Sequence, residues 1–318
     1  MKTLIFGAGP LGSLYACLLN KAGNDVTLLA RNEHYHFVKE HGIILENEFS
    51  GEKMIEKVNV VDSLEEEDLY DVLIVIMRKN SLEKVLPILG KNKKVENFLF
   101  MGNNTLGFDE YLEHLPEEKV LFGFPGGGGS RIDHVVHYID TEKPNGKRLP
   151  IVLGEINGML KERTMRIKTM FEEAGVPVKT VDDIDSWLKY HVAFVMPVAG
   201  ALLRSGDNYK LAQDKETIRM YIRAVKEGGR VLKALGYTKS YNPKFKFFYW
   251  FPEGLLINIL KKLFNSKFAE VAMMMHVRAA RDEMIEIGNE LLTLQARTSI
   301  QIPNLEELIN VTKKINEK

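Results

Sequence analysis

The chain has 318 residues, more than a single compact core usually serves, so we expect two domains. Its content of 45% hydrophobic and 27% charged residues is typical of a globular protein that folds in water. The 43 Lys and Arg residues are balanced by 43 Asp and Glu residues, and this balance argues against a molecule dominated by a nucleic-acid-binding surface. It leaves room for one local basic patch that binds a phosphate.

The chain contains one cysteine, Cys17, which excludes an intramolecular disulfide and a cysteine-based zinc site. We expect Cys17 to pack inertly within a buried helix, and the lack of disulfides fits a reducing cytoplasm. The N-terminus runs straight into a strand, so we expect no signal peptide. No apolar run is long enough to predict a membrane span, and no spacing of His, Asp and Glu predicts a metal site.

The first 30 residues predict a strand, a helix and a second strand. Residues 3–6 form an apolar run that ends at Gly7, as a buried parallel strand does. Residues 10–22 carry apolar side chains at helical spacing, and the Gly-Asn pair that follows is typical of a helix end. Residues 25–30 follow as the next strand. A strand, a helix and a strand of this length form a βαβ unit.

The alternation of strands and helices continues through the first 182 residues. We expect strands at 71–77, 97–101, 120–124, 135–139, 151–154 and 176–181, with helices at 81–89 and 161–174. This pattern predicts a fold of the α/β class, a doubly wound Rossmann sheet flanked by helices.

The pattern then becomes helical to the end of the chain. We expect helices at 183–203, 215–235, 255–264, 268–296 and 305–315, without further strands. The domain boundary is therefore placed near Asp182 and Asp183. Residues 1–182 form the predicted Rossmann domain, and residues 183–318 form an all-helical C-terminal domain.

A glycine-rich turn joins the first strand to the first helix. Its pattern, G-x-G-x-x-G, has the context that a dinucleotide site needs, between a strand and a helix of a βαβ unit. The first glycine permits the tight turn, the second lets the backbone approach a pyrophosphate, and the third lets helix and strand pack closely. The alternative is a purely structural turn. We therefore predict that the cofactor contacts Gly7, Ala8, Gly9, Pro10, Leu11 and Gly12.

The residue after the second strand bears on the choice between NADH and NADPH. Sites that prefer NAD usually carry Asp or Glu there to bind the ribose hydroxyls, whereas this chain has Arg31. A guanidinium pairs bidentately with a 2′-phosphate, so we predict NADPH (NADP) as the cofactor. Two alternatives stay open: Arg31 is a solvated surface charge, or the nearby Glu33 allows NAD to bind as well.

Taken together, three features resemble ketopantoate reductases (2-dehydropantoate 2-reductases) over nearly the whole chain. They are the GAGPLG turn, the arginine after the second strand, and an all-helical second half that opens with Trp187-Leu188-Lys189. The resemblance implies a cytoplasmic oxidoreductase that reduces 2-dehydropantoate with NADPH, on the route to pantothenate and coenzyme A. It also implies that the C-terminal domain binds the substrate and forms any homodimer. Related proteins of the same architecture act on other substrates.

The resemblance also implies roles for single residues. Lys189 matches the family's catalytic lysine, which stabilises and protonates the oxygen that becomes charged in ketone reduction; otherwise it is an ordinary exposed lysine. Asn103 matches an asparagine that contacts cofactor and substrate, with a turn residue as the alternative. Within the glycine run 126–129, Gly129 is expected to approach the cofactor, unless the run is a mobile loop. Arg78 replaces a family lysine and is expected to bind the cofactor or a carboxylate.

Several positions depart from the family pattern in the substrate-binding half. Polar residues of the family fall on Ala193, Pro197, Ala272 and Met284 here, with Asp282, Glu283 and Glu286 beside the last. A pocket built to hydrogen-bond a hydroxyl rejects analogues strongly. The loss of these polar groups therefore indicates a more apolar substrate or an altered activity.

Three functions stay open on the sequence. The first is an NADPH-dependent reductase of a 2-oxo acid or related ketone, and the second is an NADPH-binding sensor that has lost catalysis. The third is a dehydrogenase of the 3-hydroxyacyl or 6-phosphogluconate type, although its substrate motifs are missing. We expect a small-molecule partner, and neither nucleic acid nor membrane. The aromatic and basic stretch Lys244–Phe264 fits core packing, a lid, a homodimer contact or a membrane-surface helix.

Overall fold

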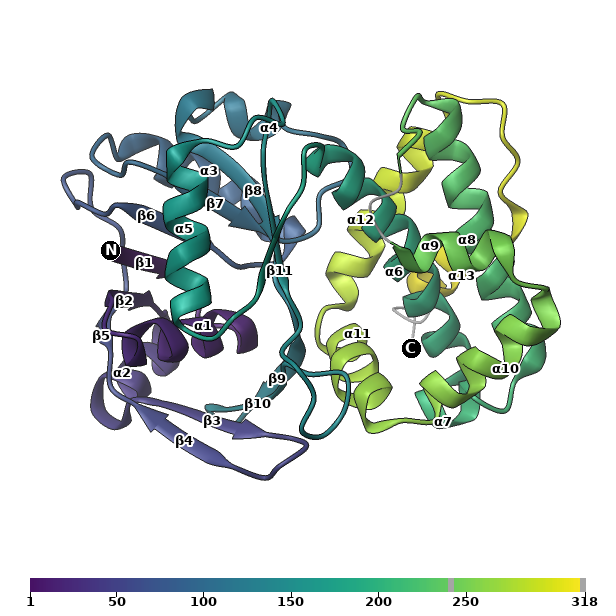
Figure 1. Cartoon of the computed structure of the whole chain (residues 1–318), viewed down its shortest axis with the longest axis horizontal. Coiled ribbons are helices and arrows are strands. Elements are labelled where there is room, and N and C mark those ends of the chain that lie inside the picture. Colours follow the sequence, from purple (N-terminus) through teal and green to yellow (C-terminus); the bar gives the residue numbers. More distant parts are fainter. Residues whose placement is uncertain (240–242, 315–318) are drawn as a thin grey trace. The chain divides into compact units, whose positions relative to one another are not determined.

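The computed structural model describes residues 1–239 and 243–314 (Figure 1). The chain divides into two compact units. The first comprises residues 1–102 and 108–184, and the second comprises residues 103–107 and 185–318. A short segment from the first half of the sequence therefore packs with the second unit, a feature that no pattern in the sequence predicted.

An eight-stranded sheet forms the centre of the first unit. Its strand order is β12-β11-β8-β7-β6-β1-β2-β5, and the strands are parallel except that β11 runs antiparallel to β8. The strands are β1 Lys2–Phe6, β2 Asp25–Leu29, β5 Asn59–Val61, β6 Val72–Val75, β7 Phe98–Met101, β8 Val120–Phe124, β11 Ile151–Glu155 and β12 Val178–Thr180. The sequence reversal at β1 gives a doubly wound α/β fold, which confirms the predicted fold class.

Helices connect the strands and cover the sheet. They are α1 Pro10–Lys21, α2 Asn32–His41, α3 Leu82–Lys91, α4 Asp109–Leu112 and α5 Glu162–Glu173, with short 3₁₀ turns at Lys79–Ser81 (η1) and Glu117–Lys119 (η2). Helix α1 packs on β2, and α5 packs on β11 and β12. Cys17 is buried in α1, where burial raises the pKa of its thiol, so it stays protonated and unreactive.

A second, four-stranded sheet belongs to the same unit. Its order is β4-β3-β10-β9, with bounds β3 Ile43–Asn47, β4 Lys53–Glu56, β9 Gly128–Ile132 and β10 Val135–Ile139. The sequence predicted only β10 of these and also missed α2 and β5. The missed elements are largely polar or half-exposed, and α2 buries only His34 and Val38, so hydrophobic periodicity gives almost no signal there.

The second unit is helical in the part that the structure describes. Its helices are α6 Ile184–Ser205, α7 Asn208–Leu211, α8 Lys215–Ala234, α9 Pro243–Trp250, α10 Glu253–Phe264, α11 His276–Ala279, α12 Arg281–Gln295 and α13 Pro303–Lys314, with a π-helical turn (η3) at Ala269–Met275. Helix α6 is long and apolar enough to cross a membrane, but 72% of its most apolar window is buried. Its apolar side chains join the core of this unit, as in a buried central helix.

Two sequence predictions need correction or completion here. The single helix expected at 268–296 is wrong, because the π-helical turn and the non-helical Ala280 (φ −121°, ψ 40°) divide it. Residue 315 of the last predicted helix lies outside the described residues.

In α9, Phe245 and Phe248 are buried in the core while Trp250 is 76% exposed, so this aromatic stretch is partly core and partly surface.

Candidate active site

The predicted glycine turn lies between β1 and α1 and is closely packed. Gly7 has a φ of +126°, and a Cβ atom built there would lie 2.3 Å from the carbonyl oxygen of Ile76. A Cβ atom on Gly12 would lie 2.0 Å from the carbonyl oxygen of Gly7. Backbone atoms cannot yield to such contacts without moving, so both positions require glycine. The neighbouring backbone thus fixes the shape of this turn.

Gly9 differs from these two glycines because open space lies beside it. No heavy atom lies within 4 Å of a Cβ built on Gly9, which is the N-cap of α1. Pro10 follows at the start of the helix, a position that proline favours. Approachable backbone at Gly9 and the N–H groups that open a helix make a cradle suited to a pyrophosphate. The turn therefore fits a dinucleotide cofactor.

Two basic residues follow the strands that flank β1. The guanidinium of Arg31, after β2, lies 5.5 Å from the centre of the Phe6 ring at the end of β1. Arg78, after β6, is exposed at the start of η1. The next residue, Lys79, is buried and forms an ion pair with Glu110. Of the two adjacent cations at 78 and 79, the arginine is therefore the accessible one.

The glycine run before β10 is part of the second sheet. Gly129 pairs with Tyr138, and a Cβ on it would lie 2.2 Å from the carbonyl oxygen of His137, which gives this glycine a packing role. The hydroxyl of Tyr15 donates to the carbonyl of Gly126 and accepts from its N–H, at 3.0 and 2.8 Å. Burial raises the pKa of Tyr15, so its hydroxyl remains protonated in this role. A contact between Gly129 and the cofactor stays a prediction.

Lys189 is a buried cation on α6 of the second unit. Its side chain is only 2% exposed, and its ammonium pairs with Asp185 one helical turn earlier. The ammonium also lies 4.9 Å from the centre of the Tyr237 ring, and the Tyr237 hydroxyl donates to Asp185 at 2.9 Å. A buried ammonium is costly unless it is paired, so this arrangement holds the charge in place. Lys189 is therefore not a solvated surface lysine.

The segment Asn103–Gly107 follows β7 and packs with the second unit. The side-chain amide of Asn103 donates to Glu283 at 3.0 Å, and the backbone N–H of Thr105 donates to Glu290 at 3.1 Å. Both carboxylates are buried on α12, seven residues apart and so on the same face of the helix. Two charge-assisted hydrogen bonds thus fasten this segment to α12.

The same segment carries buried polar atoms that indicate a ligand site. A Cβ built on Gly107 would lie 3.9 Å from Nζ of Lys189, so the segment passes beside the ammonium. Within the described structure, three buried atoms of the segment have no hydrogen-bond partner: Oδ1 of Asn103, Oδ1 of Asn104 and Oγ1 of Thr105. Each such atom costs about 1–3 kcal/mol when left unpaired, which native proteins rarely tolerate. Three in consecutive residues indicate a site for a ligand that offers N–H or O–H groups.

Glu283 is a candidate site residue that the sequence analysis named only as a neighbour of Met284. Met284 is buried in the apolar core, whereas Glu283 contacts Asn103. One residue rotates a side chain by about 100° around a helix. The apolar spacing of Met284, Ile287 and Leu291 marks the core face of α12, and this signal would have directed attention to Glu283.

Two other departures from the family pattern also lie in the interior of the second unit. Ala193 and Pro197 are buried on α6, and a Cβ built on Gly228 of α8 would lie 3.1 Å from the Cβ of Ala193. The helices pack closely here, and a side chain at position 228 would press on Ala193. Across the described residues, no group of three or more His, Cys, Asp or Glu is arranged to hold a metal ion.

Comparison with known proteins agrees with this geometry. The family model described as "Ketopantoate reductase PanE/ApbA" matches residues 3–142. The chain is therefore similar to ketopantoate reductases, a family of oxidoreductases, over these residues. The resemblance inferred from the sequence is thereby confirmed. A 2-dehydropantoate 2-reductase of Nostoc sp. is 26% identical over 193 residues, which cover 58% of this chain and 57% of that protein. This match thus spans little more than half of the length of that ketopantoate reductase.

Solved structures extend the likeness in fold to the whole chain. The 2-dehydropantoate 2-reductase from Geobacter metallireducens has a TM-score of 0.80 at 20% identity, and covers 99% of this chain and 100% of its own. A ternary complex of D-mandelate dehydrogenase with NADH and anilino(oxo)acetate also has a TM-score of 0.80, at 18% identity, and covers 100% of this chain and 98% of its own. At these identities the likeness concerns the fold, which ketopantoate reductases share with that dehydrogenase.

Proposed function

We propose that this protein is an NADPH-dependent reductase of a 2-oxo acid or a related ketone, with the type of reaction that 2-dehydropantoate 2-reductase performs in pantothenate synthesis. The observation that carries the proposal is the buried ammonium of Lys189, which Asp185 holds beside Gly107, in the segment that carries three unpartnered polar atoms. A ketone gives such a cation a task, because the carbonyl oxygen gains negative charge as it is reduced.

The first unit supports a nicotinamide cofactor. The space beside Gly9 suits a pyrophosphate, and Arg31 follows β2, where the adenosine ribose of a dinucleotide lies in Rossmann domains. The cofactor contacts that we propose are Gly7, Ala8, Gly9, Pro10, Leu11, Gly12, Arg31, Arg78, Asn103 and Gly129. When bound, the reduced nicotinamide supplies the hydride. We propose NADPH rather than NADH because a guanidinium at position 31 favours a 2′-phosphate.

Lys189 acts as the general acid in this proposal. Its ammonium donates a hydrogen bond to the carbonyl oxygen of the substrate, stabilises the charge that develops there and then transfers a proton to it. Asp185 stabilises the charged form of Lys189, and Tyr237 holds the Asp185 carboxylate by its hydroxyl. A positioned general acid contributes roughly 10²- to 10⁴-fold to a rate.

The polar atoms of Asn103–Gly107 orient the substrate or the nicotinamide amide. The amide oxygen of Asn103 accepts a hydrogen bond from the bound molecule while its nitrogen stays on Glu283. Alanine at 193 and methionine at 284 remove two polar groups of the family pattern, which supports a substrate with an apolar side chain. A structural relative holds the aromatic compound anilino(oxo)acetate, so aromatic 2-oxo acids belong among the compounds to be tested.

The decisive experiment compares two lysine variants in an NADPH oxidation assay with 2-dehydropantoate and a panel of aliphatic and aromatic 2-oxo acids. Lys189→Ala should lower turnover at least 100-fold, on the order expected for losing a general acid, and should leave the Kd of NADPH nearly unchanged. Lys233→Ala, which removes an exposed lysine from α8, is the matched control and should retain full turnover. Full activity in the Lys189 variant would contradict the assignment.

A second candidate is an NADPH-binding sensor without catalysis. The observation that favours it is the burial of Ala193, Pro197 and Met284, where the family pattern has polar groups. Tight NADPH binding by the unaltered chain, with no turnover of any compound in the panel, would support this candidate and reject the reductase.

We also propose a cytoplasmic location and a homodimer for this protein. The single, buried cysteine supports a reducing compartment. The homodimer rests on the resemblance to ketopantoate reductases, and sedimentation velocity across a range of protein concentrations would test it. No nucleic-acid partner forms part of this proposal.

A further inference from the structure

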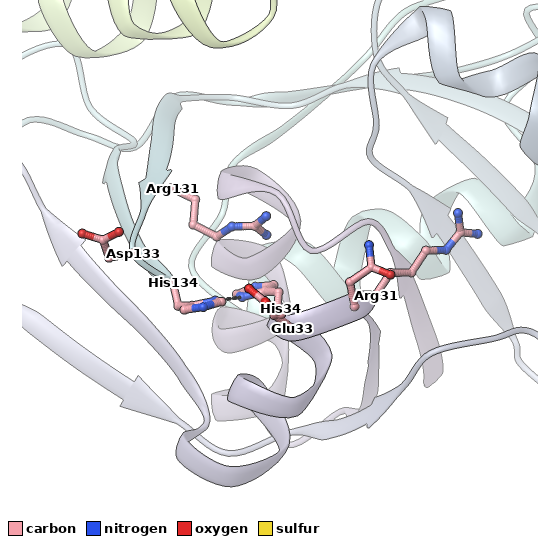
Figure 2. A pocket seen from close by; sticks show the side chains of 7 residues that line it. Arg31, Glu33, His34, Arg131, Asp133 and His134 are labelled. Carbon is pink, nitrogen blue, oxygen red and sulfur yellow. Dashed lines mark hydrogen bonds between the residues drawn. The ribbon is translucent and has the colours of Figure 1, made fainter.

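A pocket of about 570 Å³ opens in the first unit between the start of α2 and the hairpin that joins β9 to β10. Arg31, Glu33 and His34 line it from the α2 side, and Arg131, Asp133 and His134 line it from the hairpin. Figure 2 shows the rings of His34 and His134 meeting in this pocket, with Arg131 extending from the hairpin beside the pair and the side chains of Arg31 and Asp133 pointing away from it. Two arginines and two carboxylates balance in charge, so the two histidines decide the net charge.

Arg131 connects this pocket to the glycine turn. Its guanidinium donates a hydrogen bond of 2.6 Å to the carbonyl oxygen of Ala8, within the turn expected to hold the pyrophosphate. Arg31 marks the other side of the pocket, at the end of β2, where the adenosine ribose of a dinucleotide lies. The pocket therefore lies between the expected positions of the pyrophosphate and the ribose.

Three residues that line the pocket have an unusual backbone conformation. Asn32, Asp133 and His134 line the pocket with φ values of +56°, +46° and +68°. In the described residues, only Asn145 joins them as a non-glycine residue with positive φ. Asp133 and His134 form a two-residue hairpin turn, a place where Asn-Gly is strongly preferred. Aspartate and histidine occupy these positions instead and place a carboxyl group and an imidazole at the pocket.

The two histidines form a pair that can accept one proton. Their Nδ1 atoms lie 3.1 Å apart. The Phe37 ring stacks on the His134 ring, with 4.5 Å between the ring centres. A hydrogen bond between two Nδ1 atoms needs exactly one proton between them, so one ring donates and the other accepts. A further proton on Nε2 of the donating ring makes it an imidazolium without breaking this bond. A second added proton would break it, so the pair takes up one at most.

From this geometry we propose that Arg131 and the His34–His134 pair bind the 2′-phosphate of NADPH, with uptake of one proton by the pair. The inference rests on the proposed use of NADPH and adds the hairpin to the residues that determine the preference for NADPH over NADH. Arg31 then flanks the phosphate from the opposite side of the pocket, in addition to the role expected from its place after β2.

The charges that face the pair explain the link to pH. Arg131 and Asp133 line the pocket from the hairpin, and Arg31 and Glu33 line it from the start of α2, with the Arg31 side chain pointing away from the pair. Burial, then the charges of Arg131 and His134, lower the pKa of His34 to about 4, so this ring is neutral at pH 7 in the free protein. A phosphate dianion favours the protonated pair. Affinity for NADPH should therefore decrease as pH rises, by at most tenfold per pH unit for one proton, while affinity for NADH should not.

The experiment measures the Kd values of NADPH and NADH for the whole protein by calorimetry between pH 6.5 and 8.5, a range in which the phosphate is mainly dianionic. Arg131→Gln should lower the ratio of NADPH affinity to NADH affinity about tenfold or more, because a charge-assisted hydrogen bond is lost. His134→Asn should also lower the ratio and should abolish its pH dependence. Asparagine tolerates the positive φ at this position, so the turn is preserved.

Two control variants make the result specific. Arg166→Gln removes an exposed arginine of α5 and should leave the ratio unchanged, while Asp133→Asn keeps the turn and should raise the ratio by removing a negative charge. Preference for NADPH that survives unaltered in Arg131→Gln and His134→Asn would overturn only the hairpin site. Equal affinity of the unaltered chain for both cofactors would overturn this site and the choice of NADPH, and binding of neither would overturn the proposed function as well.

Discussion

The two units build their candidate sites in different ways. In the first unit, the glycine turn is one run of consecutive residues, and its shape follows from contacts of glycine with nearby backbone. In the second unit, Lys189, Asn103 and Glu283 come from three separate segments; Lys189 pairs with Asp185, and Asn103 donates to Glu283. The contacts that shape the second site also stabilise its unit. A substitution there should therefore affect folding and function together, whereas the first unit allows the two to be separated.

The largest expected effect concerns a buried ion pair between β11 and α5, which stabilises the first unit away from the glycine turn. Glu155 on β11 is buried and binds Arg163 and Thr164 of α5. Arg163→Ala leaves this carboxylate without its main partner and should reduce the free energy of unfolding by about 3–5 kcal/mol. Urea unfolding at pH 7 measures this, and the folded fraction should still bind NADPH.

The same pair gives a pH dependence of stability with a defined sign. Burial raises the pKa of Glu155, but the hydrogen bonds from Arg163 and Thr164 outweigh it and lower the pKa below its usual value of 4.5. A lowered carboxyl pKa contributes stability that is present above 4.5 and lost as the pH falls through the folded-state value. The stability difference between the unaltered chain and Arg163→Ala should therefore shrink below pH 4.5. A constant difference would show that the carboxylate charge is not involved.

The next effect tests the charge pair at the centre of the second site. Asp185→Asn removes the charge that holds Lys189 and should lower kcat about 10- to 100-fold, as expected for losing a charge-assisted hydrogen bond of about 1.5–3 kcal/mol. The Kd of NADPH should change little. Asp185→Glu should restore part of the turnover, because it returns a carboxylate near the ammonium. Loss of NADPH binding in the asparagine variant would instead indicate a general structural defect.

A smaller effect should link folding and function through Glu290. Glu290→Ala leaves the backbone N–H of Thr105 unpaired in the interior, which should cost about 1–3 kcal/mol of stability. Turnover at a temperature well below unfolding should fall as well, because the Asn103–Gly107 segment loses one of its two hydrogen bonds to α12. Asn289→Ala, at the exposed neighbouring position, serves as the control for both measurements. A stability loss with full turnover would separate folding from function in this unit.

The smallest effect on stability should come from Gly9 in the glycine turn. Gly9→Ala places a methyl group in open space, so the melting temperature should change little while the affinity for NADPH falls. Gly12→Ala forces the same methyl group onto backbone and should cost about 1–3 kcal/mol of stability in addition. Unchanged NADPH affinity in Gly9→Ala would show that the cofactor does not approach this glycine.

The sequence predicted the parts of the molecule that depend on local patterns. The βαβ unit around Gly7–Gly12 follows from apolar runs and glycines, and the long helices from 3.6-residue periodicity. It did not predict α2 or the second sheet, whose polar faces give no period, nor the π-helical turn at Ala269–Met275. The pocket with His134 depends on a hairpin that brings residues 100 positions apart together. The apolar spacing along α12 pointed toward Glu283, but its contact with Asn103, 180 residues away, follows only from the fold.

The assignment of Asn103–Gly107 to the second unit has a consequence for how the chain folds during synthesis. Along the chain, residues 103–107 of the second unit come before residues 108–184 complete the first unit, and the rest of the second unit follows from residue 185. Those five residues therefore leave the ribosome long before α12, which carries the carboxylates that bind them. A fragment that starts at residue 185 would lack them altogether and bury Glu290 without the Thr105 N–H, so neither half is a self-contained product for separate expression.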